Sequence, residues 1–159
     1  MSAKVGIIMG SKSDLEIMQA AANTLDGFGV EYEIRVVSAH RTPDEMNEYA
    51  KTAKERGLKI IIAGAGGSAH LPGMTASHTT LPVLAVPIKK NPHDHEALWS
   101  NIKMPPGVPL ATMPENGAKN AALMAVEILG IEDAGLLEKY QDFKQKQHDQ
   151  VVSDDKSIR

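Results

Sequence analysis

A histidine and an arginine stand side by side at His40 and Arg41, after an apolar run and just before a predicted helix. Histidine is the side chain that exchanges protons near neutral pH. The planar guanidinium of arginine presents a fork of N–H donors that suits phosphate. Ser38 adds a hydroxyl two residues earlier. An isolated pair of this kind more often consists of exposed surface residues without a function than of site residues. Its interpretation therefore depends on where the fold places it.

The helix start that follows the pair is strongly marked. Thr42 is a suitable N-cap, Pro43 fits the first helical position, and Glu45 supplies an acid at the third. Because the helix begins there, we expect His40 and Arg41 to lie in the short connection between it and the preceding strand.

A second polar loop has the sequence GSKSD at residues 10–14. Its hydroxyls and glycine lead into a predicted helix N-terminus, where free backbone N–H groups and the helix dipole favour an anion. An equally good interpretation makes Ser13 an N-cap, with Glu16 completing a capping box. Asp14 would repel a phosphate, so a sugar hydroxyl is its better partner.

A third loop, residues 64–70, has the sequence GAGGSAH and is followed by LPGM. Four glycines between residues 64 and 73 allow the backbone to approach a ligand closely. The plainer alternative is a tightly packed strand-to-helix turn. His70 is either a second acid-base group or a hydrogen-bonding loop residue, and we favour a binding role.

Two further histidines, His93 and His95, flank an aspartate and raise the question of a metal site. A His-x-His pair in a loop without a third defined ligand is weak evidence. We therefore interpret both as exposed loop residues and predict no metal. Lys89 and Lys90 could extend a basic rim, although such pairs are usually only solvated.

The elements that must position these loops alternate along the chain. Strands are predicted at residues 5–9, 31–37, 59–63, 81–87 and 108–112, the last at an edge because of Pro109. Helical periodicity marks residues 15–28, 46–53, 95–102 and 118–129. This alternation predicts a flavodoxin-like three-layer αβα sandwich with a central parallel sheet. The strands lack in-out alternation, as expected when helices cover both faces.

The three polar loops all follow strands. Open parallel sheets bind ligands beyond the carboxyl ends of their strands, so these loops are predicted to meet at one edge. That convergence is the strongest evidence for a site that the residues give by themselves.

Composition limits the possible functions. The chain has 159 residues, 42% of them hydrophobic, with no cysteine for disulfides or thiolate metal ligands. A net charge of −3 and 4% aromatic residues do not support nucleic-acid binding. Neither a signal peptide nor a membrane span is expected, which suggests a cytoplasmic protein. Residues 1–130 are predicted to form a single α/β domain, and residues 131–159 a polar, helical extension that lies on a neighbouring subunit or in solvent.

Three motifs resemble those of the PurE family, in particular the class I, bacterial N5-carboxyaminoimidazole ribonucleotide mutases. They are GSKSD at residues 10–14, SAHRTP at 38–43 and GAGGSAHLPGM at 64–74. The resemblance covers most of residues 4–130. It departs from the family pattern in segments 89–100 and 113–116 and at Ser68, which leaves the lid and the subunit contacts open.

The resemblance implies an isomerase of purine (IMP) biosynthesis. It would move a carboxyl group by decarboxylation and recarboxylation, with His40 as the acid/base. It also implies a homo-octamer with sites near subunit boundaries, and no metal or organic cofactor. The substrate phosphate would be held by Ser11, Ser13, Ser38 and Arg41, and the ribose hydroxyls by Asp14. The remaining substrate-binding residues would be Ala39, Ala65, Gly66, His70 and Leu71.

Three alternatives stay open. An aminoimidazole ribonucleotide carboxylase using free CO2 belongs to a sister branch, which has lysine where Arg41 stands and a different loop at residues 66–72. PurE-like domains also occur in carboxylases acting on nicotinate dinucleotide, usually in longer chains with an extra N-terminal region. A non-enzymatic, phosphate-binding flavodoxin-like module is the third.

Overall fold

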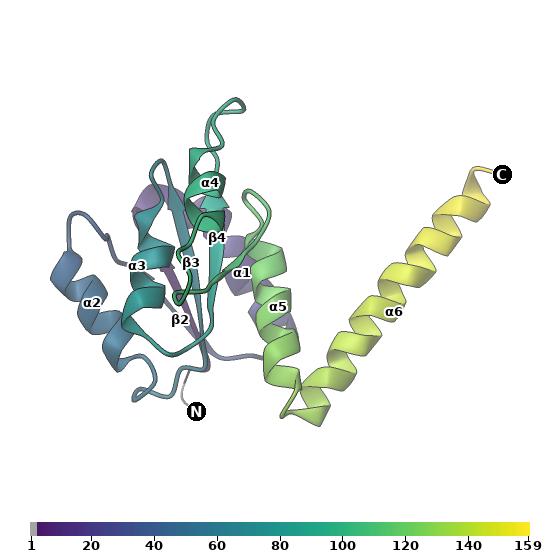
Figure 1. Ribbon diagram of the computed structural model, residues 1–159. Coiled ribbons are helices and arrows are strands. Elements are labelled where there is room, and N and C mark those ends of the chain that lie inside the picture. Colours follow the sequence, from purple (N-terminus) through teal and green to yellow (C-terminus); the bar gives the residue numbers. More distant parts are fainter. Residues whose placement is uncertain (1–2) are drawn as a thin grey trace.

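The computed structural model describes residues 3–159 and places a parallel five-stranded sheet between two layers of helices (Figure 1). The strand order is β2-β1-β3-β4-β5, the doubly wound order of flavodoxin-like proteins. The predicted three-layer fold is therefore confirmed. The strands are β1 (Val5–Met9), β2 (Tyr32–Val36), β3 (Ile60–Gly66), β4 (Val83–Ile88) and β5 (Ala111–Thr112).

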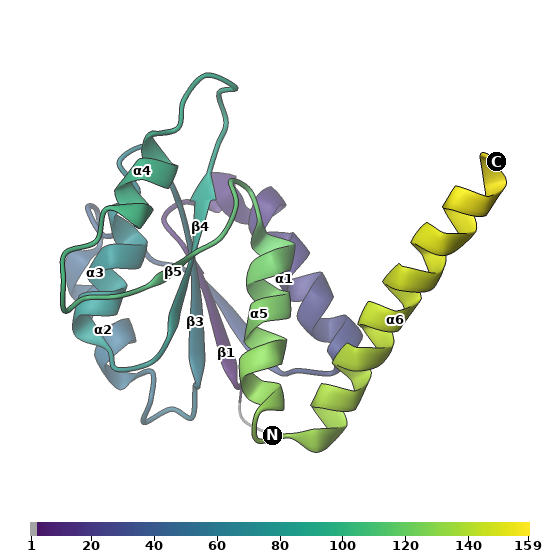
Figure 2. The same cartoon turned by 45° about the vertical axis from the view of Figure 1, so that its right-hand side comes forward.

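The helices divide between the two faces of the sheet (Figure 2). Helices α1 and α5 cover one face, and α2, α3 and α4 cover the other. Their bounds are η1 (Lys12–Asp14, a 3-10 turn), α1 (Leu15–Phe28), α2 (Pro43–Thr52), α3 (His70–His78), α4 (Glu96–Ile102), α5 (Ala118–Gly130) and α6 (Ala134–Ser157).

Successive residues of β1 point to opposite sides of the sheet and build two cores. Ile7 packs toward α1 and α5, whereas Ile8 packs toward α2 and α3. Strand β2 is less buried than this arrangement leads one to expect, because Ile34 is 37% and Val36 54% exposed. As the outermost strand of the sheet, β2 is only partly covered by helices.

The glycine segment connects its strand to a helix by a shorter loop than residues 64–70, the strand-to-helix turn named as the plainer alternative. Strand β3 continues to Gly66, and α3 begins at His70, so only residues 67–69 connect them. Ala69 has a left-handed backbone (φ 46°). Helical periodicity does not mark residues 70–78, yet α3 forms there with Pro72 in its first turn, where proline is tolerated.

Two predicted helix caps take other partners. The capping box at Ser13 and Glu16 does not form: Ser11 caps η1 by accepting the Ser13 N–H at 3.3 Å. Thr42 does precede α2, with Pro43 in its first turn, but its hydroxyl accepts the Ser38 N–H at 2.9 Å. The Ser11 and Thr42 hydroxyls therefore stabilise the loops that precede the two helices.

Helix α6 leaves the body of the domain after its first turns (Figures 1 and 2). Asp133 caps it by accepting the Leu136 N–H at 3.0 Å. Tyr140 and Phe143 pack around Phe28, which anchors the near end of the helix on α1. Beyond this anchor the helix is exposed. No helix within residues 3–159 is both long enough and apolar enough to cross a bilayer.

Candidate functional site

A cavity of about 500 Å³ opens at the carboxyl ends of the central strands. The three polar loops meet around it, and every site residue expected from the sequence lies in its wall. These residues are Ser11, Ser13, Asp14, Ser38, Ala39, His40, Arg41, Ala65, Gly66, His70 and Leu71. The parallel register of β1 with β2 and β3 brings the loops to the same edge.

The two histidines of the cavity are in direct contact. His40 Nε2 lies 2.7 Å from His70 Nδ1, and the rings meet edge to face with their centres 4.8 Å apart. His40 comes from the β2–α2 connection, and His70 is the first residue of α3. Both are solvent-accessible, as an acid-base group that must reach a ligand requires.

Arg41 joins the first polar loop to the second. Its Nη2 donates to the Gly10 carbonyl at 2.7 Å, and its Nε donates to the Ser38 hydroxyl at 3.3 Å. The guanidinium is thereby held at the cavity wall, which the Ser11 and Ser13 hydroxyls, 3.0 Å apart, also line. Two hydroxyls, a 3-10 turn and a fixed cation are a suitable environment for a phosphate.

Asp14 is buried at the base of this group, with a side chain only 6% exposed. Lys90 neutralises it: the lysine Nζ lies 2.7 Å from Asp14 Oδ1 and 2.7 Å from the Ser13 hydroxyl. Sequence reasoning noted Lys90 only as a possible basic rim. Its partner lies 76 positions earlier in the chain, and the only local signal was the doubled lysine.

Other residues of the β4–α4 connection also reach the cavity. Asn91 and Asp94 line it together with Ile88. Asn91 and Asp94 use a side-chain oxygen to accept backbone N–H groups of residues two positions later, at 3.1 and 2.9 Å. The segment that departs from the family pattern therefore forms part of the site wall.

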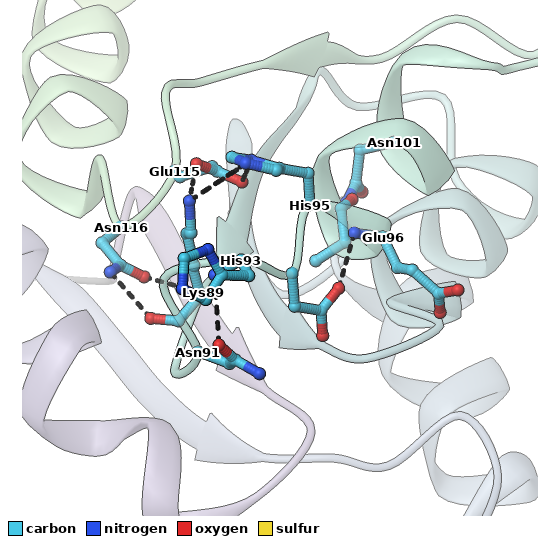
Figure 3. Close-up of polar contacts among 10 residues, drawn as sticks. Lys89, Asn91, His93, His95, Glu96, Asn101, Glu115 and Asn116 are labelled. Carbon is cyan, nitrogen blue, oxygen red and sulfur yellow. Dashed lines mark hydrogen bonds and ion pairs between the residues drawn. The ribbon is translucent and has the colours of Figure 1, made fainter.

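His95 forms an ionic cluster with Glu115 and Lys89 (Figure 3). His95 Nδ1 lies 2.7 Å from one Glu115 oxygen, and Lys89 Nζ lies 3.2 Å from the other. Partial loss of hydration raises the pKa of the Glu115 carboxyl, but hydrogen bonds from His95 and Lys89 outweigh it and leave the pKa below its ordinary value. Among residues 3–159 no group of three metal-binding side chains occurs.

Comparison with known proteins gives concordant matches. The family model described as AIR carboxylase matches residues 4–150. The N5-carboxyaminoimidazole ribonucleotide mutase of Thermotoga maritima is 53% identical over 150 residues, covering 94% of this chain and 88% of the relative. The mutase of Aquifex aeolicus is 60% identical over 132 residues, covering 82% and 79%.

The fold also matches a solved structure over its whole length. The crystal structure of Treponema denticola PurE superposes with a TM-score of 0.90 at 28% sequence identity, covering 99% of both chains.

Proposed function

The chain belongs to the AIR carboxylase family, and on that premise we propose that it is an isomerase of purine biosynthesis. It converts N5-carboxyaminoimidazole ribonucleotide into 4-carboxy-5-aminoimidazole ribonucleotide, the reaction for which its relatives are named. The observation that carries the proposal is the meeting of one imidazole and one anion cradle in a single cavity.

The cradle holds the substrate by its phosphate. Ser11, Ser13, Ser38 and Arg41 supply hydroxyls and a guanidinium on one side of the cavity. Asp14, beside them, accepts hydrogen bonds from the ribose hydroxyls. Ala39, Ala65, Gly66, His70 and Leu71 line the space left for the aminoimidazole ring and the migrating carboxyl group.

His40 moves one proton in each direction. Protonated His40 gives its proton to the exocyclic nitrogen as the N–C bond of the carbamate breaks and CO2 leaves. The ring C4 then attacks the retained CO2, forming the new C–C bond, and His40 takes the C4 proton as aromaticity returns. Holding CO2 beside C4 gives an effective concentration that solution cannot match. General acid-base help contributes about 10²–10⁴-fold.

Arg41 and the short glycine connection favour the mutase over the CO2-dependent carboxylase. The sister branch has lysine at the position of Arg41 and another loop at residues 66–72. The relatives named as mutases also match most of this chain at more than half identity. A module that only binds phosphate would not require the paired histidines.

Assembly into a cytoplasmic homo-octamer belongs to the same proposal. Residues up to 130 form the catalytic unit, and residues 131–159 serve assembly through α6. On this helix the side chains of Leu137, Val151 and Val152 are between 39% and 67% exposed. Contact between copies of the chain would bury this apolar surface. Light scattering at micromolar concentration should give eight times the chain mass; a monomer mass would refute the assembly.

The decisive experiment supplies freshly prepared N5-carboxy substrate carrying 13C in its carboxyl group, without ATP or added bicarbonate. Label appearing at C4 supports the mutase. Product formed only from aminoimidazole ribonucleotide and CO2 would instead identify the carboxylase. If no product forms from either substrate, the result would identify the chain as a binding module.

A further inference from the structure

We propose that Lys90 is a further substrate-recognition residue, which neutralises Asp14 and donates a hydrogen bond to the substrate phosphate. The inference rests on the proposed function, because it concerns the nucleotide that this site binds. It assigns a role to a residue of the β4–α4 connection, the segment in which the sequence departs from the family pattern.

The position of the ammonium group carries the argument. Lys90 Nζ is 2.7 Å from both Asp14 Oδ1 and the Ser13 hydroxyl, so it lies where the phosphate and ribose parts of the site adjoin. An ammonium has three N–H donors, and these two contacts use two of them. Its side chain is 54% exposed and lines the cavity, so the third donor can reach a ligand.

The backbone that presents Lys90 is held firmly. The Asn116 side chain accepts the Lys89 N–H at 2.8 Å and donates to the Lys89 carbonyl at 3.0 Å (Figure 3). The Lys89 side chain runs to Glu115. The two lysines therefore diverge: Lys89 ties the loop to the β5–α5 connection, whereas Lys90 reaches across the cavity to η1. A cation presented by a fixed backbone loses less freedom when it binds.

Charge balance gives the reason for a lysine at this position. Apart from histidines, the cavity wall formed by the described residues has two carboxylates, Asp14 and Asp94, and two cations, Arg41 and Lys90. Without Lys90 the wall would be net negative, and the buried Asp14 carboxylate would stand unpaired next to an incoming phosphate. Like charges in one cavity disfavour binding.

The test compares Lys90→Ala, Lys90→Gln and Lys90→Arg with the unaltered enzyme. Kd is measured for the product nucleotide and for the same product without its phosphate. Loss of one charge-assisted hydrogen bond corresponds to about 10- to 100-fold weaker nucleotide binding. We expect that loss in the Ala and Gln variants, with nearly unchanged nucleoside binding and recovery in Lys90→Arg. KM should rise by a similar factor while kcat changes little.

Lys51→Ala is the matched control, because it removes one positive charge from an exposed position on α2 that is not in the cavity wall. An unchanged nucleotide-to-nucleoside affinity ratio in Lys90→Ala and Lys90→Gln would overturn the inference. Equally weaker binding of the nucleotide and the nucleoside would also overturn it, because that result would indicate a structural effect through Asp14. If the unaltered enzyme binds nucleotide but forms no product, the proposed function fails separately.

Discussion

His40 Nε2 and His70 Nδ1 face each other across 2.7 Å, within hydrogen-bonding distance. In a hydrogen bond between these two nitrogens, one ring must donate and the other accept. The contact joins the β2–α2 connection to the start of α3 and aims His40 into the cavity. The proposed roles of His40 and His70 in turnover depend on this contact.

Replacing His40 with Asn should abolish turnover and leave substrate binding intact. Asparagine can still hydrogen-bond to a neighbour but cannot exchange a proton near neutral pH. The rate should fall by at least the 10²–10⁴-fold typical of general acid-base catalysis. Steady-state kinetics and product affinity measure the two effects. Near-normal turnover would remove His40 from the mechanism.

His70 should act by positioning His40. In His70→Leu the contact is lost, and we expect kcat to fall by roughly tenfold, the effect of a misplaced acid-base group. His70→Asn keeps a polar atom near the position of Nδ1 and should recover part of the activity. Equal activity in all three forms would contradict this role.

Arg41→Ala should chiefly raise KM. The change removes the guanidinium that joins Gly10 to Ser38, and with it a charge-assisted contact to phosphate worth about tenfold or more in affinity. Arg56→Ala is the matched control, since Arg56 pairs with Glu33 outside the cavity. An unchanged KM in Arg41→Ala would exclude the phosphate role.

The Glu115 cluster should make stability depend on acid pH. Because the folded pKa of Glu115 lies below its ordinary value of 4.5, its contribution is complete above about pH 4.5 and is lost as pH falls through the lower folded value. Glu115→Gln should therefore lose stability near neutrality and show a shallower decline in acid. Denaturant unfolding from pH 3 to 7 measures both curves; parallel curves would contradict the assignment.

Gly64→Ala should destabilise the fold. A methyl group there would overlap the buried Met18 sulfur and lie 3.1 Å from Ile88 Cδ1, so a filled core must move. Overpacking of this kind costs about 1–3 kcal/mol. Gly27→Ala is the control: its methyl meets nothing within 4 Å, and alanine favours a helix by up to about 1 kcal/mol. Thermal unfolding should move in opposite directions for the two variants.

Local sequence pattern was sufficient to predict the alternation of strands and helices, and hence the parallel sheet. Apolar runs mark buried strands because their backbones must pair and their side chains must leave water. It also placed the three polar loops after strands, so that their meeting at one edge followed from topology alone. Helical periodicity did not mark residues 70–78, although Pro72 and Gly73 lie in the first turns of α3.

Which atoms touch was decided only by the tertiary structure. His40 and His70 are 30 positions apart, and Lys90 and Ser13 are 77 positions apart, so no local pattern relates either pair. Their contacts depend on strand register, on where β3 ends, and on the clamp of Asn116 on Lys89. Residue types reveal which chemistry is available. The distances between the side chains that carry out this chemistry are set by the packing of elements far apart in the chain.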